Sequence, residues 1–132
     1  MQKILIIDDD EDISAMLFLL LRSKFEVAVI TKSEDIFQKI RTFEPHIILL
    51  DVFLTGYDGR VICKQLKFHP SSKNIPVIMV SGHDEVSDSV TKYGADDFIL
   101  KPFEGDQLIA KIDKLLASRG VQHQPPFNFS NT

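Results

Sequence analysis

Short apolar runs alternate along this chain with longer segments whose apolar residues recur every three or four positions. The short runs are rich in isoleucine, valine and leucine, and they cover residues 4–7, 25–30, 47–50, 77–80 and 98–100. Runs of this length and composition are typical of strands that are buried on both faces. The longer segments have helical spacing and are expected at about 12–22, between Ser33 and Pro45, and at about 58–67, 84–92 and 104–118.

The order of these segments predicts the fold class. Strands and helices alternate strictly, which favours an α/β protein with a parallel sheet and helices on both of its faces. For a chain of this size we expect a flavodoxin-like, doubly wound, five-stranded parallel sheet with strand order 2-1-3-4-5 and five helices. In that order the first and third strands are neighbours at the switch point of the sheet.

Three of the strand-length runs end in charged residues. The first is followed by Asp8 and Asp9, the third by Asp51, and the fifth by Lys101. The carboxyl ends of parallel strands share one edge of the sheet, where ligands bind in open α/β folds, so these side chains are expected to converge. Clustered carboxylates repel one another unless a cation lies between them. An all-oxygen donor set suits Mg²⁺, which we therefore expect at this edge.

Composition and charge limit the possible functions. The chain has 132 residues, 44% of them hydrophobic and 26% charged, which is the size and balance of one globular domain. The net charge of −4 gives no reason to expect direct nucleic-acid binding. Cys63 is the only cysteine, and no apolar stretch resembles a signal peptide or a membrane span, so a cytoplasmic protein without membrane contact is expected. We expect the folded domain at 1–119 and a flexible tail or the start of a linker at 120–132.

Several short motifs, in this order and at these strand ends, resemble a response regulator receiver domain over residues 2 to about 118. They are Ile-Ile-Asp8-Asp9, Leu-Leu-Asp51 with Gly59 eight residues later, Val80-Ser81-Gly82, Gly94-Ala95-Asp96-Asp97-Phe98 and Lys101-Pro102-Phe103. Each motif alone is weak, and the combination is specific. One departure is Leu54-Thr55, where many receivers carry Met-Pro.

The resemblance implies a phosphoacceptor of two-component signalling. Asp51 would accept a phosphoryl group from a histidine kinase or a phosphotransfer protein. Asp8, Asp9 and Asp51 would hold Mg²⁺ together with the backbone carbonyl of Phe53, and Lys101 would pair with the phosphoryl oxygens. Such a protein is not an enzyme acting on separate substrates, because it catalyses only its own phosphotransfer and a slow autodephosphorylation.

The resemblance also implies a switch. Ser81 would hydrogen-bond the phosphoryl group, and Phe98 would change position on activation. The output surface would comprise the fourth helix, the fifth strand and the fifth helix, with an unknown output partner and a weak homodimer on phosphorylation as a further expectation. The Lys101-Pro102 peptide bond is usually cis in this family. Phe53 and His83 flank the expected site and would modulate the lifetime of the phosphorylated form.

Other interpretations of the same residues stay open. Asp8 and Asp10 fit the Asp-x-Asp motif of haloacid-dehalogenase-like phosphohydrolases, although that family usually has a longer chain. A pseudo-receiver that only mediates interactions is a second alternative, although such modules normally lose an acid or the lysine. Ser81 could belong to a simple turn, and Phe98 could be an ordinary core residue. A flavodoxin is disfavoured, because the aspartates after the first strand would repel its phosphate.

Overall fold

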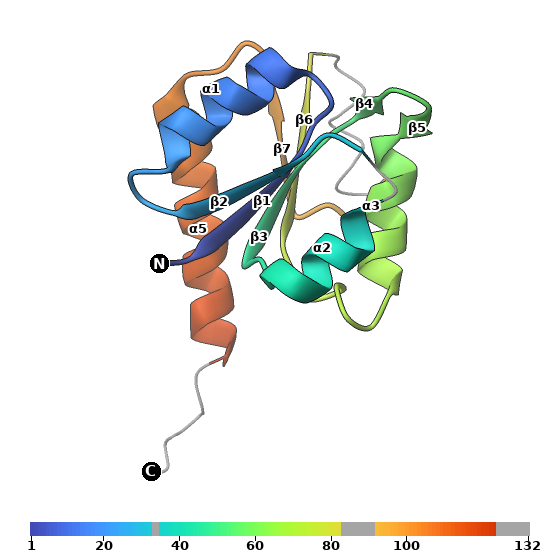
Figure 1. The fold of residues 1–132 in the computed structure, drawn as a ribbon. Coiled ribbons are helices and arrows are strands. Elements are labelled where there is room, and N and C mark those ends of the chain that lie inside the picture. The colour runs from blue at the N-terminus through green and yellow to red at the C-terminus, as the bar shows by residue number, and fades with distance from the viewer. Residues whose placement is uncertain (33–34, 83–91, 124–132) are drawn as a thin grey trace.

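The computed structural model describes residues 1–32, 35–82 and 92–123 (Figure 1). Five parallel strands form one sheet in the order β2-β1-β3-β6-β7. Their bounds are β1 Lys3–Ile7, β2 Glu26–Ile30, β3 Ile47–Asp51, β6 Val77–Ser81 and β7 Asp97–Leu100. Because β6 and β7 are the fourth and fifth strands of this sheet, the predicted order 2-1-3-4-5 is confirmed.

Helices cover both faces of the sheet, as Figure 1 shows. Their bounds are α1 Glu11–Leu21, α2 Ile36–Phe43, α3 Gly59–Phe68 and α5 Gly105–His123. Side chains of α1 and α5 pack in one hydrophobic cluster, and side chains of α2 and α3 pack in a second cluster on the other face. The described residues therefore contain four of the five expected helices. The helix expected at 84–92 falls almost entirely on residues 83–91, outside the described ranges.

The local sequence explains where the helices begin and end. The side chain of Asp10 accepts hydrogen bonds from the backbone N–H groups of Asp12 and Ile13, which caps the start of α1. Helix α2 ends at Phe43, and Glu44, which follows it as the C-cap, adopts a left-handed conformation with φ of 55°. The following Pro45 disfavours a helical conformation at Glu44, so the helix stops there.

Two features differ from the sequence-based expectation. The loop after β3 contains a short antiparallel hairpin, formed by β4 (Phe53–Leu54) and β5 (Tyr57–Asp58), with Gly56 at a φ of 81°. Helix α5 continues to His123, beyond the end at about residue 118 that the apolar pattern predicts. Gly120 lowers helix stability by only about 1 kcal/mol, which does not by itself end a helix.

The register of the strands brings their carboxyl ends together. Ile7 in β1 pairs with Leu50 in β3, and Ser81 at the end of β6 pairs with Leu100 at the end of β7. The residues that follow these positions therefore leave the sheet along one edge, the upper edge in Figure 1.

Candidate functional site

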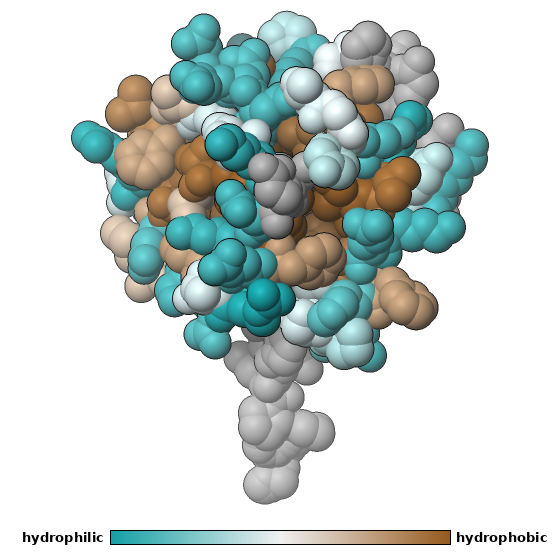
Figure 2. Space-filling view, turned by 45° about the vertical axis from the view of Figure 1, so that its right-hand side comes forward, coloured by the Kyte–Doolittle hydropathy of each residue, from teal (hydrophilic) through white to brown (hydrophobic). Residues whose placement is uncertain are grey.

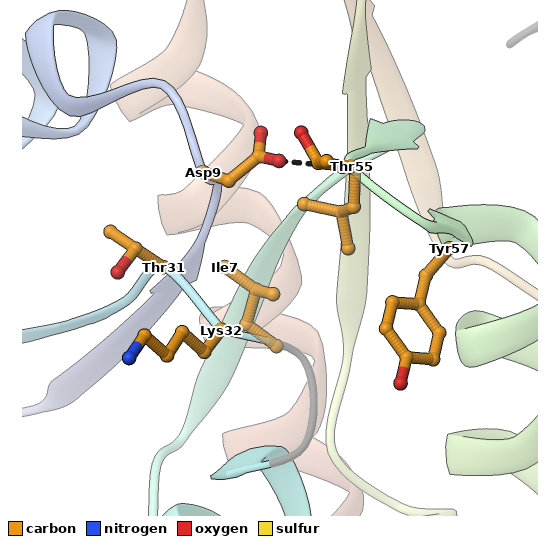
Figure 3. Close-up of a pocket in the computed structure, with 7 residues that line it drawn as sticks. Ile7, Asp9, Thr31, Lys32, Thr55 and Tyr57 are labelled. Carbon is orange, nitrogen blue, oxygen red and sulfur yellow. Dashed lines mark hydrogen bonds between the residues drawn. The ribbon is translucent and has the colours of Figure 1, made fainter.

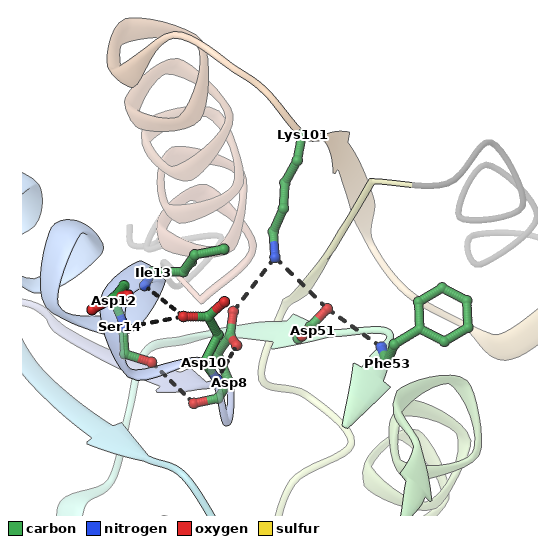
Figure 4. A network of polar contacts seen from close by, with 8 residues as sticks. All are labelled: Asp8, Asp10, Asp12, Ile13, Ser14, Asp51, Phe53 and Lys101. Carbon is green, nitrogen blue, oxygen red and sulfur yellow. Dashed lines mark hydrogen bonds and ion pairs between the residues drawn. The ribbon is translucent and has the colours of Figure 1, made fainter. Parts of the chain in front are cut away.

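Asp8 and Asp51 lie at the ends of neighbouring strands, and both carboxyl groups are largely buried (Figure 4). Asp8 is 2% exposed and Asp51 is 9% exposed. Lys101 reaches in from the end of β7, and its Nζ atom lies 3.7 Å from Oδ2 of Asp8 and 4.0 Å from Oδ1 of Asp51. One ammonium group thus faces two buried carboxyl groups, and the positive charge does not fully balance the site.

Burial dominates the electrostatics of this pair. It raises the pKa of Asp51 to about 6, and the nearby charge of Asp8 acts in the same direction. Burial also raises the pKa of Asp8, against the lowering effect of the Asp10 backbone N–H, 2.9 Å from Oδ1, and of the Lys101 charge. Both carboxylates are therefore less stable as free anions than they would be in water.

Asp9 is turned towards the hairpin that follows β3 (Figure 3). Its Oδ2 atom accepts a hydrogen bond of 2.5 Å from the backbone N–H of Thr55. Hydrogen bonds from Thr55 lower the pKa of Asp9, so this carboxylate is held in its ionised form. Asp9 also lines a cavity of about 290 Å³ between the hairpin and the loop after β2, with Tyr57 and Lys32 among the other lining residues.

The three aspartates have the donor chemistry of a site for a hard divalent cation. Asp8, Asp9 and Asp51 each offer a carboxylate oxygen, and these oxygens lie within 4.8 Å of one another. Two of the three groups are buried carboxyls whose anionic forms are disfavoured, which a bound cation would relieve. The oxygen-only donor set fits Mg²⁺ in type and in number, with room left for water or a substrate oxygen.

The remaining residues that the sequence predicts for the site lie on or after strands β6 and β7. Ser81 is 1% exposed, and its backbone carbonyl accepts a 2.7 Å hydrogen bond from the N–H of Lys101. The Lys101–Pro102 peptide bond is cis. Phe98 is half-buried in β7, with Nζ of Lys111 5.9 Å from its ring centre. His83 lies outside the described residues.

The backbone around Asp51 is fixed by contacts that the strand pattern alone does not reveal. The N–H of Phe53 donates to Oδ1 of Asp51 at 3.3 Å, and the N–H of Gly59 donates to the carbonyl of Val52 at 2.6 Å. A Cβ atom on Gly59 would lie 2.1 Å from the backbone oxygen of Asp51. The sequence signal for this close approach is the glycine itself, eight residues after the aspartate.

A second contact that the sequence did not predict supports the loop between β1 and α1. The hydroxyl of Ser14 donates a 3.0 Å hydrogen bond to the backbone carbonyl of Asp8, and Ser14 is 4% exposed. This bond ties the end of β1 to helix α1, as Figure 4 shows. The sequence signal for this contact is Ser14 itself, the one polar residue of α1 after Glu11 and Asp12.

Comparison with known proteins identifies the family. Residues 4–113 match the response regulator receiver domain family. The chain is 33% identical over 114 residues to the DNA-binding response regulator MtrA of Mycolicibacterium paratuberculosis, which covers 84% of this chain and 49% of that protein. It is 37% identical over 123 residues to the sensory transduction protein RegX3 of Mycobacterium bovis, covering 91% and 53% respectively.

A solved structure agrees with these matches. The signal receiver domain of a DNA-binding response regulator from Colwellia psychrerythraea superimposes with a TM-score of 0.80 at 28% identity, covering 89% of this chain and 99% of that one. The chain therefore belongs to the response regulator receiver domain family, as the sequence motifs predicted. It spans about half the length of the curated relatives named above.

The comparisons also bear on two expectations about partners. Two of the similar proteins are named as DNA-binding regulators, so the expectation that this chain does not bind nucleic acid directly is not supported. None of the helices in the described part of the chain is both long and apolar enough to span a bilayer.

Proposed function

We propose that Asp51 accepts a phosphoryl group from the phosphohistidine of a histidine kinase, or of a phosphotransfer protein. The observation that carries this proposal is the placement of Asp51 beside Asp8 and within 4.0 Å of the Lys101 ammonium, at the carboxyl edge of the sheet. Receiver-family membership supports the same role. The chain in this proposal acts on its own aspartate rather than on a separate substrate.

The transfer needs a nucleophile and positive charge, and the residues supply both. A carboxylate oxygen of Asp51 forms a bond to phosphorus, while the bond from phosphorus to the histidine nitrogen breaks and its electron pair returns to that nitrogen. The N–H of Phe53 orients Oδ1 of Asp51. Lys101 then neutralises charge on the equatorial phosphoryl oxygens, and the buried Ser81 hydroxyl donates a hydrogen bond to one of them.

Mg²⁺ is the cation we propose for the acidic cluster. Asp8, Asp9 and Asp51 would hold it together with the backbone carbonyl of Phe53. When bound, the ion supplies positive charge that stabilises the transferring phosphoryl group. The hydrogen bond from Thr55 keeps Asp9 ionised and orients its carboxylate, so that this residue is ready to bind a cation.

The proposed output surface consists of β7, α5 and the segment 84–92. A hollow of about 510 Å³ lies on the described part of this surface, lined by Phe98, Leu100 and Lys111 among others. Leu100 is 38% exposed there. When Ser81 moves towards the phosphoryl group, it vacates space for Phe98, and a change at the site is then passed to this surface. Phosphorylation would favour a weak homodimer.

The test is phosphorylation by a small-molecule donor. Incubation with acetyl phosphate and Mg²⁺ should add one phosphoryl group, which hydroxylamine should remove because the product is an acyl phosphate. Asp51→Asn should take up none, and Asp10→Asn should take up as much as the unchanged protein. Asp10 is the matched control because asparagine also caps a helix well. Unchanged uptake by Asp51→Asn would move the nucleophile to another residue.

A further inference from the structure

The outer side of helix α3 exposes apolar side chains in a row. Val61 is 53% exposed and Phe68 is 86% exposed, whereas Ile62 and Leu66 point into the core. Val61 and Phe68 are seven positions apart, so both lie on the same side of the helix and form one stripe rather than scattered exposures.

The same segment is basic. Residues 59–75 contain four lysines and arginines and no acidic residue, in a chain whose net charge is −4. Arg60 and Lys67 are paired with aspartates. Lys64 and Lys73 are exposed, and neither forms an ion pair with any residue in the described ranges. Lys64 lies on the helix between Val61 and Phe68, so a positive charge without an ion-pair partner among the described residues borders the apolar stripe.

We propose that this surface binds an acidic amphipathic helix of a partner protein. The surface consists of Val61, Lys64, Phe68 and Lys73 and is called the α3 face below. Its apolar members would be the central anchors, and its two lysines would pair with carboxylates at the edge of the interface. Figure 2 brings the side of the molecule that carries α3 forward, and hydrophobic residues there are set among hydrophilic ones.

The spacing of the anchors explains why a helix fits. Val61 and Phe68 are seven residues apart, which corresponds to about 10 Å along a helix. A partner helix with apolar residues seven positions apart presents its side chains at the same interval. Glutamates on either side of that stripe would face the lysines. Two lysines are too few to make a nucleic-acid surface on a chain of net negative charge, so an acidic protein partner is the better match.

The first experiment compares two designed peptides of about 18 residues, a length at which helices can form in isolation. The acidic peptide carries leucines at positions i and i+7 flanked by glutamates, and its twin carries lysines in place of the glutamates. Titration of the isotope-labelled full chain should move the amide signals of α3 with the acidic peptide only. Phe68→Ser should weaken binding about fivefold. Leu19→Ser, a similarly exposed position on α1, should leave binding unchanged.

A charge exchange gives the sharper result. The double variant Lys64→Glu, Lys73→Glu should lose about tenfold in affinity for the acidic peptide and gain binding to the basic twin. All substituted residues are exposed, so the thermal midpoint should stay unchanged and confirm that the variants fold. Equal binding of the two peptides, amide shifts centred outside α3, or binding that Phe68→Ser leaves intact would overturn the proposal. Self-association through this surface, or binding to phosphatidylserine vesicles instead of the acidic peptide, would also overturn it.

Discussion

Asp8 and Asp51 show how one residue pair sets both the stability and the chemistry of the site. Each is held at a strand end by the packing of its own strand, so neither can move away from the other. Burial raises the pKa of each carboxyl group, and the Lys101 ammonium offsets only part of the repulsion between them. The metal-free protein is therefore less stable than its core packing alone would allow.

The first prediction concerns this repulsion. Millimolar Mg²⁺ should stabilise the folded protein by about 1 kcal/mol, which corresponds to a rise of about 4 °C in the midpoint of thermal unfolding. Asp8→Asn should raise the midpoint of the metal-free protein and abolish the shift with Mg²⁺, because the amide carries no charge. Asp9→Asn should also abolish the shift. Asp10→Asn, outside the acidic cluster, should keep it. A midpoint that is indifferent to Mg²⁺ in the unchanged protein would contradict the metal site.

The second prediction concerns Phe53, which is 50% exposed two residues after Asp51. Hydrolysis of the phosphorylated form needs a water molecule in line with the phosphorus–Asp51 bond. A bulky apolar ring at this position restricts water without offering a hydrogen bond, whereas an amide can orient a water molecule. Phe53→Asn should therefore speed dephosphorylation several-fold, a change in the barrier of about 1 kcal/mol. The measurement is the decay rate of phosphorylated protein at fixed Mg²⁺ and pH.

A matched variant separates the apolar character of the Phe53 side chain from its aromatic ring. Phe53→Leu keeps an apolar side chain and should decay at nearly the rate of the unchanged protein. If Phe53→Asn decays at the same rate or more slowly, the side chain does not control access of water.

Some site residues could be read from the sequence because they occupy strand ends. Asp8, Asp51 and Lys101 follow apolar runs, and the alternation of strands and helices fixes which ends are neighbours. The contact between Asp9 and Thr55 could not be read in this way. It depends on a short hairpin whose strands have two residues each, too few to produce a periodic pattern.

At the scale of the elements, several contacts hold the loop after β3 in place. The hairpin of β4 and β5 returns the chain towards the sheet, and α3 begins immediately afterwards with Gly59 packed on the backbone of Asp51. The side chain of Asp58 accepts a 2.9 Å hydrogen bond from the N–H of Arg60 and caps this helix. Asp51 is thus fixed from its carboxyl side by the start of a helix.

The third prediction tests that close approach. Gly59→Ala places a Cβ atom 2.1 Å from the backbone oxygen of Asp51, so either the helix or the end of β3 must shift. We expect a loss of about 2 kcal/mol in the free energy of unfolding, measured by urea denaturation. Gly82→Ala is the control, because a Cβ atom there meets nothing within 4 Å and its φ lies outside the left-handed range that disfavours side chains. A loss of equal size in both variants would show that the contact with Asp51 is not the cause.

The helices illustrate why element ends are harder to predict than elements. The start of α1 was expected one residue from its observed position, because polar residues at the end of β1 mark it. The end of α5 was expected about five residues too early, since the amphipathic pattern fades after Leu116 while the helical backbone continues to His123. A helix can outlast the apolar stripe that packs it against the sheet, and sequence periodicity records only the packed part.

At the scale of the whole molecule, strands β6 and β7 connect the proposed phosphorylation site to the proposed output surface. Strand β6 ends in Ser81 and pairs with β7, whose Phe98 lies beside α5. Of the four residues of β7, only Ile99 is buried, so this strand has less of its side-chain surface in the core than β1, β3 or β6. A strand with few buried side chains needs less free energy to shift than a central one.

The last prediction is the pattern of backbone change on activation. Beryllofluoride with Mg²⁺ mimics the phosphoryl group on Asp51, and amide hydrogen exchange should then change most between residues 82 and 104. Exchange in α2 should stay unchanged, since this helix packs on the opposite cluster from α5. Asp51→Asn treated in the same way should show no change in either region. Changes confined to the hairpin of β4 and β5 would mean that the signal leaves the site through the loop after β3 instead of through β7, because Thr55 in that hairpin is the direct contact of Asp9.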